Sequence, residues 1–207
     1  MQFSLWLALL GAGTLISFTP GAGAINTMSN ALVSGFRRSL WGILGQQAAL
    51  ILHIIVVALG VGVLVSSSPV AFNVIRYAGA AYLVYLGIRQ FLSTPQVDEE
   101  SVEALRNESA WSMFRRGLWV NLLNPKAIVF FLAFLPQFIR LDQPLWPQYL
   151  VVAGTVVTID ILVMWFFFAA AARSFQRFTR DARGQRVLNR IFGVLFVAVG
   201  VLLAFIH

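Results

Sequence analysis

The sequence has 207 residues, of which 59% are apolar and only 11% are charged. A soluble domain has roughly 45–50% apolar and about 25% charged residues, so composition excludes an ordinary soluble fold. The chain has no cysteine, which excludes disulfides and cysteine-bound metal centres. Its two histidines, His53 and His207, are too few to build a zinc site by themselves. We therefore expect neither a metal nor a cofactor.

Six apolar stretches follow one another along the chain and predict an all-α integral membrane protein. About 20 apolar helical residues cross a hydrocarbon core of about 30 Å, so six spans leave only short connections and make residues 1–207 a single transmembrane domain. The expected spans are 3–27, 39–65, 69–91, 117–139, 146–172 and 187–206, with a polar linker over 92–116. Each stretch is apolar on all sides, which suits lipid-embedded helices.

The arginines are distributed unevenly between the two sides of this arrangement. The first, third and fifth connections hold twelve arginines, while the opposite side has only Arg140. Because basic loops stay in the cytoplasm, we expect the linker at 92–116 to be cytoplasmic and both termini to be periplasmic. This topology accounts for the net charge of +7, so we expect no nucleic-acid partner. The twelve are Arg37, Arg38, Arg89, Arg106, Arg115, Arg116, Arg173, Arg177, Arg180, Arg183, Arg186 and Arg190.

The first apolar stretch also has some features of a secretory signal peptide. Leu5 to Ile16 is followed by Pro20 and by the small residues Ala22-Gly23-Ala24. A signal peptide also begins with a positively charged region, which is missing here, and its removal would leave five spans. We therefore expect this stretch to remain as the first span.

Three charged side chains, Arg76, Lys126 and Asp160, lie inside the expected spans. Each costs roughly 2.5–3.5 kcal/mol at the bilayer centre. Arg76 and Lys126 are long enough to reach an interface, but Asp160 lies about 21 Å into its span and cannot. It is either a hydrogen-bonded structural group or a site for a proton or an ammonium group. His53, at a similar depth, is a second candidate for proton coupling, with a structural hydrogen bond as the alternative.

Proline interrupts the first and fourth spans. Thr19-Pro20 is followed by Gly21 and Gly23, and Asn121 precedes Asn124-Pro125-Lys126. Proline inside a helix costs about 3 kcal/mol, whereas Thr or Asn at the N-cap before proline is a helix start. The pattern predicts that both spans break and restart inside the membrane, with ordinary proline kinks as the alternative.

Two restarted helices in spans of opposite direction predict a particular kind of membrane protein. A restarted helix offers free N–H groups and a partial positive charge to an anion. The first span runs inward and the fourth runs outward. The chain would therefore consist of two halves of three spans each, and the two halves would have opposite orientations in the membrane. This is the arrangement of inverted-repeat transporters, whose substrate site lies near the midplane.

Several motifs resemble one family of membrane proteins. They are residues 19–28 (TPGAGAINTM), 35–38 (GFRR), 121–138 with its Asn124-Pro125-Lys126, 160–161 (DI) and 189–193 (NRIFG). Together they resemble the resistance-to-homoserine/threonine family of the lysine exporter superfamily, and the AINTM stretch is similar to homoserine/homoserine lactone efflux proteins. The resemblance implies a bacterial inner-membrane exporter of homoserine, homoserine lactone and threonine, driven by proton antiport. A membrane-embedded enzyme or a passive channel for small polar solutes is the alternative.

An amino-acid substrate needs an anion site and a cation site a few ångströms apart. Lys126 and the amides after Asn124 would hold its carboxylate, and Asp160 its ammonium group or the coupling proton. The expected substrate-binding residues are Pro20, Gly21, Gly23, Asn26, Gln46, Asn121, Asn124, Pro125 and Lys126, and the proton-coupling residues are Asp160 and His53. The expected partners are these small substrates and membrane lipid, and the sequence is compatible with a homo-oligomer.

Overall fold

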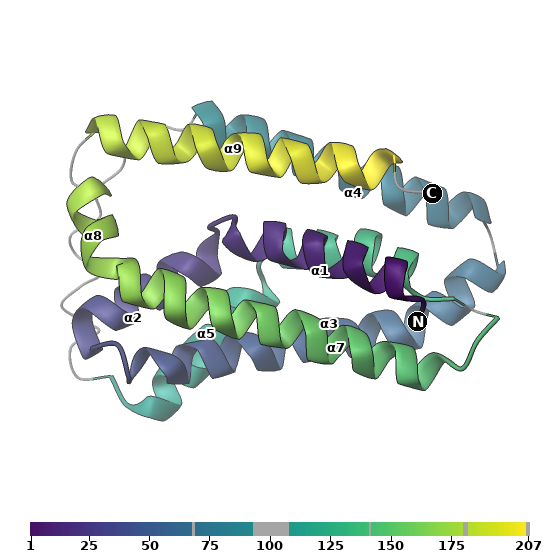
Figure 1. Ribbon diagram of the computed structural model, residues 1–207, viewed down its shortest axis with the longest axis horizontal. Coiled ribbons are helices and arrows are strands. Elements are labelled where there is room, and N and C mark those ends of the chain that lie inside the picture. Colours follow the sequence, from purple (N-terminus) through teal and green to yellow (C-terminus); the bar gives the residue numbers. More distant parts are fainter. Residues whose placement is uncertain (68, 93–107, 141, 180–181, 206–207) are drawn as a thin grey trace.

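The computed structural model describes residues 1–67, 69–92, 108–140, 142–179 and 182–205. All regular secondary structure in these ranges is helical, as the composition predicts. Most of the helices run along the long axis of the molecule, and α8 lies across one end (Figure 1). In chain order they are α1 (Phe3–Phe18), α2 (Ala22–Ser34), α3 (Ser39–Ser67), α4 (Pro69–Leu92), α5 (Ala110–Leu122), α6 (Pro125–Val129), η2 (Phe130–Phe134), η3 (Leu135–Phe138), α7 (Leu145–Leu162), η4 (Val163–Ala169), α8 (Ala170–Thr179) and α9 (Ala182–Phe205).

Four of the six predicted spans correspond to segments that are long and apolar enough to cross a membrane. Ser39–Gly60 and Leu145–Ser174 meet this condition as single helical segments. The pair α1 and α2 and the pair formed by α5 with the helical segment up to Phe138 meet it as bent helices, with bends of 57° and 53°. The remaining two, α4 and α9, are 24 residues each, or about 36 Å at 1.5 Å per residue.

Several helix boundaries differ from the predicted spans. The helix predicted to begin at 117 begins at Ala110, where the Ser109 hydroxyl accepts a hydrogen bond from the Ser112 amide at 3.1 Å. Residues 110–116 are therefore helical and do not belong to the linker, whose residues 93–107 lie outside the described ranges. Likewise α2 continues to Ser34 and α9 begins at Ala182. Hydropathy marks where a helix is apolar, whereas its backbone hydrogen bonds extend into the polar turns beyond.

Close helix pairs use glycine where two backbones meet. α3 packs along α5, and α4 packs along α9. A Cβ atom added at Gly117 would collide with the backbone of Gly42, and one added at Gly87 would lie 2.7 Å from the carbonyl oxygen of Gly193. Small residues at such crossings let membrane helices approach closely, which provides packing where the hydrophobic effect between helices is weak.

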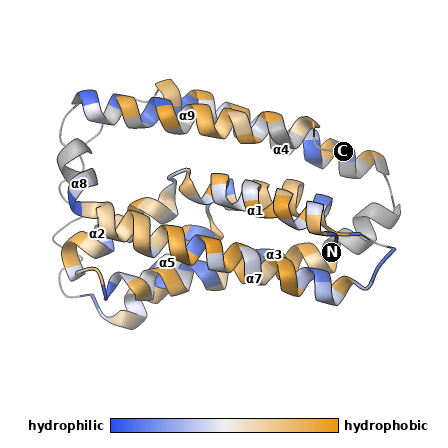
Figure 2. Cartoon of the chain, in the orientation of Figure 1, coloured by the Kyte–Doolittle hydropathy of each residue, from blue (hydrophilic) through white to orange (hydrophobic). Residues whose placement is uncertain are grey.

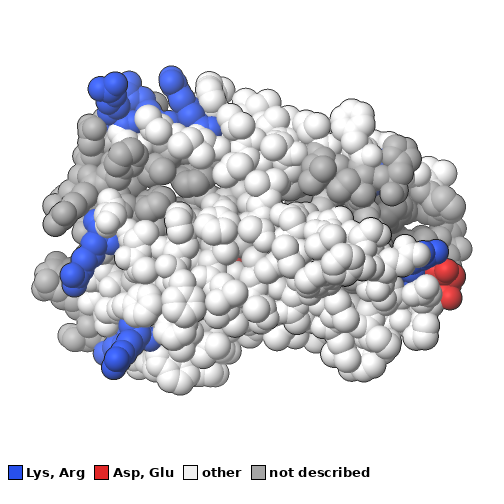
Figure 3. All heavy atoms as spheres, in the orientation of Figure 1, with Lys and Arg blue, Asp and Glu red and all other residues white. Residues whose placement is uncertain are grey.

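The outer surface is suited to lipid. Large apolar side chains such as Val56, Leu59, Val74 and Val194 are more than half exposed, and α7 and α9 are mainly hydrophobic between their ends (Figure 2). Soluble monomers rarely expose large apolar patches. Most of the Lys and Arg side chains seen in Figure 3 lie at one end of the molecule, and a basic side chain lies beside acidic ones at the other end. In the same orientation α1 begins and α9 finishes at the opposite end.

Candidate substrate-binding site

The break between α5 and α6 is a helix start of the predicted kind. Asn124 is the N-cap, with extended backbone, and Pro125 occupies the first turn of α6. The Asn124 side-chain oxygen accepts a hydrogen bond from the Lys126 amide at 3.1 Å. The prediction of a restarted helix at Asn124-Pro125 is confirmed. In this state the Lys126 amide is already bonded to Asn124, so it is not available to a substrate carboxylate.

The break between α1 and α2 lies where it is predicted, but the residue that caps α2 is not the predicted one. Gly21 is the N-cap of α2, and Pro20 lies before the cap, outside the first helical turn. The Thr19 hydroxyl donates to the Leu15 carbonyl oxygen at 2.8 Å, one turn back along α1. The prediction that Thr19 caps α2 is therefore wrong. Its hydroxyl satisfies a carbonyl of the preceding turn, as Ser and Thr often do in helices.

Lys126 connects the two breaks. Its Nζ atom donates to the carbonyl oxygens of Ile16 at 3.1 Å and Thr19 at 2.6 Å. Nζ also lies 5.8 Å from the centroid of the Phe196 ring of α9. Lys126 is only 9% exposed, so its side chain does not reach an interface in this state. Its charge faces the carbonyl end of α1, where the helix carries partial negative charge.

Asp160 is held from two other helices. Its Oδ1 accepts a hydrogen bond from the Ser17 hydroxyl of α1 at 3.1 Å, and its Oδ2 accepts one from Gln47 Nε2 of α3 at 2.7 Å. Asp160 is 8% exposed. Both carboxylate oxygens thus have a partner, as a buried polar group requires.

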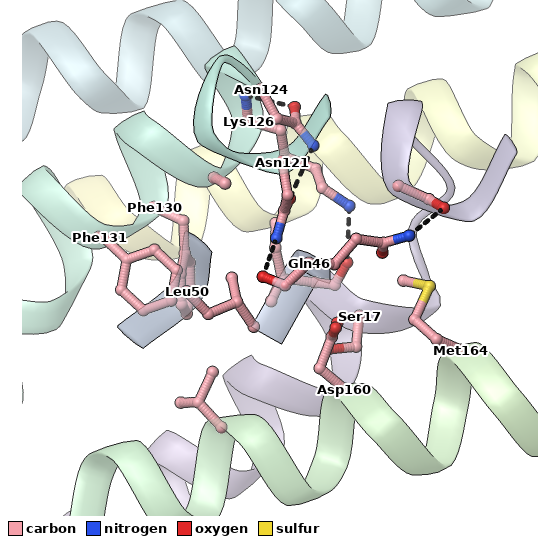
Figure 4. Close-up of a pocket in the computed structure, with 14 residues that line it drawn as sticks. Ser17, Gln46, Leu50, Asn121, Asn124, Lys126, Phe130, Phe131, Asp160 and Met164 are labelled. Atoms are coloured by element: carbon pink, nitrogen blue, oxygen red, sulfur yellow. Dashed lines mark hydrogen bonds between the residues drawn. The ribbon is translucent and has the colours of Figure 1, made fainter. Parts of the chain in front are cut away.

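These groups face one small cavity, drawn in Figure 4, with a volume of about 40 Å³. By the volume that one water occupies, it has room for a few waters and not for an amino acid. Ser17 and Asp160 point toward each other on one side, and Asn121, Asn124 and Lys126 lie on the other (Figure 4). The lining residues are Ile16, Ser17, Gly23, Gln46, Leu50, Asn121, Asn124, Lys126, Ala127, Phe130, Phe131, Val156, Asp160 and Met164.

Hydrogen bonds tie the amide side chains of the cavity wall to the breaks. Gln46 Nε2 donates to the Gly23 carbonyl at 3.2 Å and to the Thr27 hydroxyl at 3.0 Å. Asn121 Nδ2 donates to the Gln46 carbonyl at 3.1 Å, and Asn124 Nδ2 donates to Asn121 Oδ1 at 3.4 Å. One chain of polar groups therefore links α2, α3, α5 and α6 around the cavity.

Five of the predicted substrate-binding residues line this cavity: Gly23, Gln46, Asn121, Asn124 and Lys126. Asp160, one of the two predicted proton-coupling residues, lines it as well. Pro20, Gly21 and Pro125 lie at the two breaks and shape the chain there. A Cβ atom added at Gly21 would lie 3.5 Å from Lys126 Cε, an ordinary contact distance, so Gly21 is an immediate neighbour of the lysine. His53 is outside the lining and stacks on Phe131, with ring centroids 5.6 Å apart.

Asn26 belongs to a second polar cluster. Its side-chain oxygen accepts a hydrogen bond from Arg116 at 2.5 Å, and Arg116 also donates to Asn30. Arg116 forms a 2.6 Å ion pair with Glu108, whose carboxylate also accepts from Ser112 at 2.8 Å. The cluster joins α2 to the start of α5.

Burial raises the pKa of Glu108, but hydrogen bonds from Arg116 and Ser112 and the charge of Arg116 outweigh that effect. The net pKa of Glu108 lies below its ordinary value. The stabilisation by this ion pair is therefore present at neutral pH and is lost as the pH falls through the lowered pKa.

Sequence reasoning missed several residues of these two clusters. Ser17 and Gln47 hold Asp160, and their signal was available, because each is a polar side chain within a long apolar stretch. Arg116 and Asn30 are separated by 86 residues, and no local pattern connects them. The apolar residues of the cavity wall, such as Leu50 and Phe131, look like any other membrane-helix residues in the sequence.

The described residues are helical, with an apolar surface and two broken helices, and a buried lysine and a buried aspartate line one cavity. Broken helices that line a polar cavity are typical of membrane transporters. The family described as "LysE type translocator" matches residues 14–206, and the chain belongs to this family of membrane translocators.

Known relatives extend over the whole chain. The homoserine/homoserine lactone efflux proteins of Salmonella typhi and Salmonella typhimurium are each 40% identical over 204 residues, which is 99% of this chain and 98% of theirs. An uncharacterized membrane protein of Vibrio cholerae is 40% identical over the same shares. No solved structure matches the chain.

Proposed function

We propose that this protein exports homoserine and homoserine lactone across the bacterial inner membrane by proton antiport, and that threonine is a further substrate. The observation that carries the proposal is the pair Lys126 and Asp160, buried with opposite charge on one cavity between two broken helices. The printed function of the two Salmonella relatives supports the choice of substrate.

The proposed topology has six spans: α1 with α2, α3, α4, α5 with the segment to Phe138, α7 with η4, and α9. The gathering of basic side chains at one end supports a cytoplasmic location for that end. The start of α1 and the finish of α9 would then face the periplasm. The occurrence of one bent pair in each half supports two inverted repeats of three spans.

The cavity supplies groups for each part of the proposed substrate. Asp160 takes either the ammonium group or the coupling proton, and Lys126 takes the carboxylate once its side chain is free. Gln46, Asn121 and Asn124 offer amide groups to a side-chain hydroxyl or a lactone oxygen. Because the cavity holds only a few waters, substrate entry requires the surrounding helices to part.

Transport in inverted membrane vesicles tests this proposal. Labelled homoserine should accumulate when the vesicle interior is acidic and should not accumulate without a pH gradient. A passive channel would equilibrate homoserine regardless of the gradient, and an enzyme would convert it without accumulation.

The proton-coupling role has its own variant. Asp160→Asn keeps the size and polarity of the side chain but does not titrate, so it should insert normally and lose gradient-driven accumulation. Asp142→Asn is the matched control, because Asp142 pairs with Arg140 outside the cavity. Full gradient-driven transport by Asp160→Asn would show that a group other than Asp160 carries the coupling proton.

A further inference from the structure

The structure contains a primary ammonium group bound in the core, and this group belongs to Lys126. Nζ donates to the carbonyl oxygens of Ile16 and Thr19 at 3.1 and 2.6 Å. The ring of Phe196 lies 5.8 Å from Nζ, within the range of a cation–π contact. Two carbonyls at the end of a helix and an aromatic ring together form a cation site, supplied by α1, the break after it and α9.

The proposed substrates carry the same chemical group. Homoserine, threonine and homoserine lactone each have a primary ammonium on the α-carbon, whereas only the first two have a free carboxylate. The ammonium group is therefore the charged group through which one site can recognise all three compounds. Carbonyl oxygens recognise it through its N–H donors, which a quaternary ammonium lacks.

We propose that the carbonyl end of α1, and not Asp160, is the ammonium subsite of the transporter, and that Lys126 occupies it when no substrate is bound. Asp160 is then left to carry the coupling proton. The substrate ammonium replaces the Lys126 ammonium at Ile16 and Thr19. The released Lys126 side chain then pairs with the substrate carboxylate where there is one. The identity of the ligand rests on the proposed function, whereas the ability of the site to bind a primary ammonium does not.

The location of Ser17 supports this assignment. It follows Ile16 in the chain, lines the same cavity and donates to Asp160 at 3.1 Å. An ammonium group at the end of α1 therefore lies beside the acidic side of the cavity. Displacement of Lys126 from this subsite would also break the contact between α6 and the end of α1. Binding of the substrate would thus allow the two helix breaks to move apart.

Thermal unfolding of purified Lys126→Ala in detergent tests the subsite directly. The variant leaves the two carbonyls and the Phe196 ring in place but without an ammonium group. Methylammonium should raise the Tm of Lys126→Ala in a saturable way by a few degrees, because a ligand that binds only the folded state stabilises it. Tetramethylammonium at the same concentration should not. Methylammonium should shift the wild-type protein much less than Lys126→Ala, because there it must displace the Lys126 ammonium.

The control variant is Arg140→Ala, which removes a basic side chain outside the cavity and should respond to methylammonium no more than the wild-type protein does. Equal responses to methylammonium and tetramethylammonium, or no response to either in Lys126→Ala, would overturn the assignment. Phe196→Leu combined with Lys126→Ala should weaken the methylammonium response, since the ring is lost.

If Lys126→Ala does not fold, wild-type protein gives the second measurement. Homoserine lactone should bind, and its N-acetyl derivative, which has no ammonium group, should bind at least tenfold more weakly. Equal affinities for the two lactones would contradict an ammonium subsite. Failure of the wild-type protein to transport homoserine, with methylammonium still stabilising Lys126→Ala, would reject the proposed function and leave the ammonium site standing.

Discussion

The two helix breaks differ in where the hydrogen-bond partners of their backbone polar groups come from. At the break between α5 and α6, Asn124 and Pro125 complete the new helix with groups from the break itself. At the break between α1 and α2, the carbonyls at the end of α1 are bonded by Lys126, which is more than 100 residues away in the chain. The start of α6 is thus capped by its neighbours. At the end of α1 the Ile16 carbonyl also accepts from the Thr19 amide at 3.2 Å, whereas the Thr19 carbonyl is bonded by the distant Lys126.

This difference indicates which contact is structural and which can be replaced by a ligand. A cap supplied by the neighbouring residue is always present at high local concentration and is hard to displace. A distant lysine can be replaced by any other ammonium group that reaches the same carbonyls. The break at the end of α1 is therefore the better place for a substrate group, and the break before α6 is the better anchor.

Removing Lys126 should have the largest effect on stability. Lys126→Met leaves the buried Thr19 carbonyl oxygen without its 2.6 Å partner. An unsatisfied buried acceptor costs about 1–3 kcal/mol, so the free energy of unfolding should fall by that amount. Equilibrium unfolding in mixed micelles measures it, with Arg140→Met as the control. An unchanged free energy would mean that α1 does not depend on Lys126.

Asn124→Ala should have the next largest effect. The substitution removes the side-chain oxygen that accepts from the Lys126 amide. Loss of an N-cap costs about 0.5–2 kcal/mol, and Asn124→Ser should restore most of it, because serine is also a good cap. The same unfolding measurement distinguishes the two variants. If serine and alanine were equally destabilising, the role of Asn124 would not be capping.

Thr19→Val should have the smallest effect. The Thr19 hydroxyl makes a hydrogen bond to Leu15 within α1 and does not cap α2. Valine keeps the shape but cannot donate to the Leu15 carbonyl. A neutral hydrogen bond contributes about 0.5–1.5 kcal/mol, so the free energy of unfolding should fall by that amount. A loss larger than that of Asn124→Ala would mean that Thr19 does more than bond to Leu15, and it would remove the contrast between the two breaks.

Local sequence predicted what local chemistry determines. The helical class, both break positions and the cap at Asn124 could be read from apolar runs and proline, since each depends on neighbouring residues. Thr19 has the same local pattern, but its hydroxyl bonds to Leu15 and Pro20 precedes the cap. A threonine before proline has two possible bonding partners, and the sequence does not choose between them.

Tertiary partners could not be predicted in the same way. Asp160 was a candidate because a buried carboxylate is costly, yet its partners Ser17 and Gln47 are 143 and 113 residues away. Asn26 was expected in the substrate site, but Arg116 binds its oxygen in the second polar cluster. A single sequence shows which polar residues are buried in a membrane protein but not which of them meet.

The most direct test of the account is the affinity of wild-type protein and Lys126→Met for homoserine and for its lactone. Both compounds gain from the absence of a competing lysine, but only homoserine loses a carboxylate partner. Loss of a charge-assisted hydrogen bond is worth about 1.5–3 kcal/mol, so in Lys126→Met homoserine affinity should fall roughly ten- to a hundredfold relative to lactone affinity. Equal losses for both compounds would contradict the roles given to Lys126 and to the carbonyl end of α1.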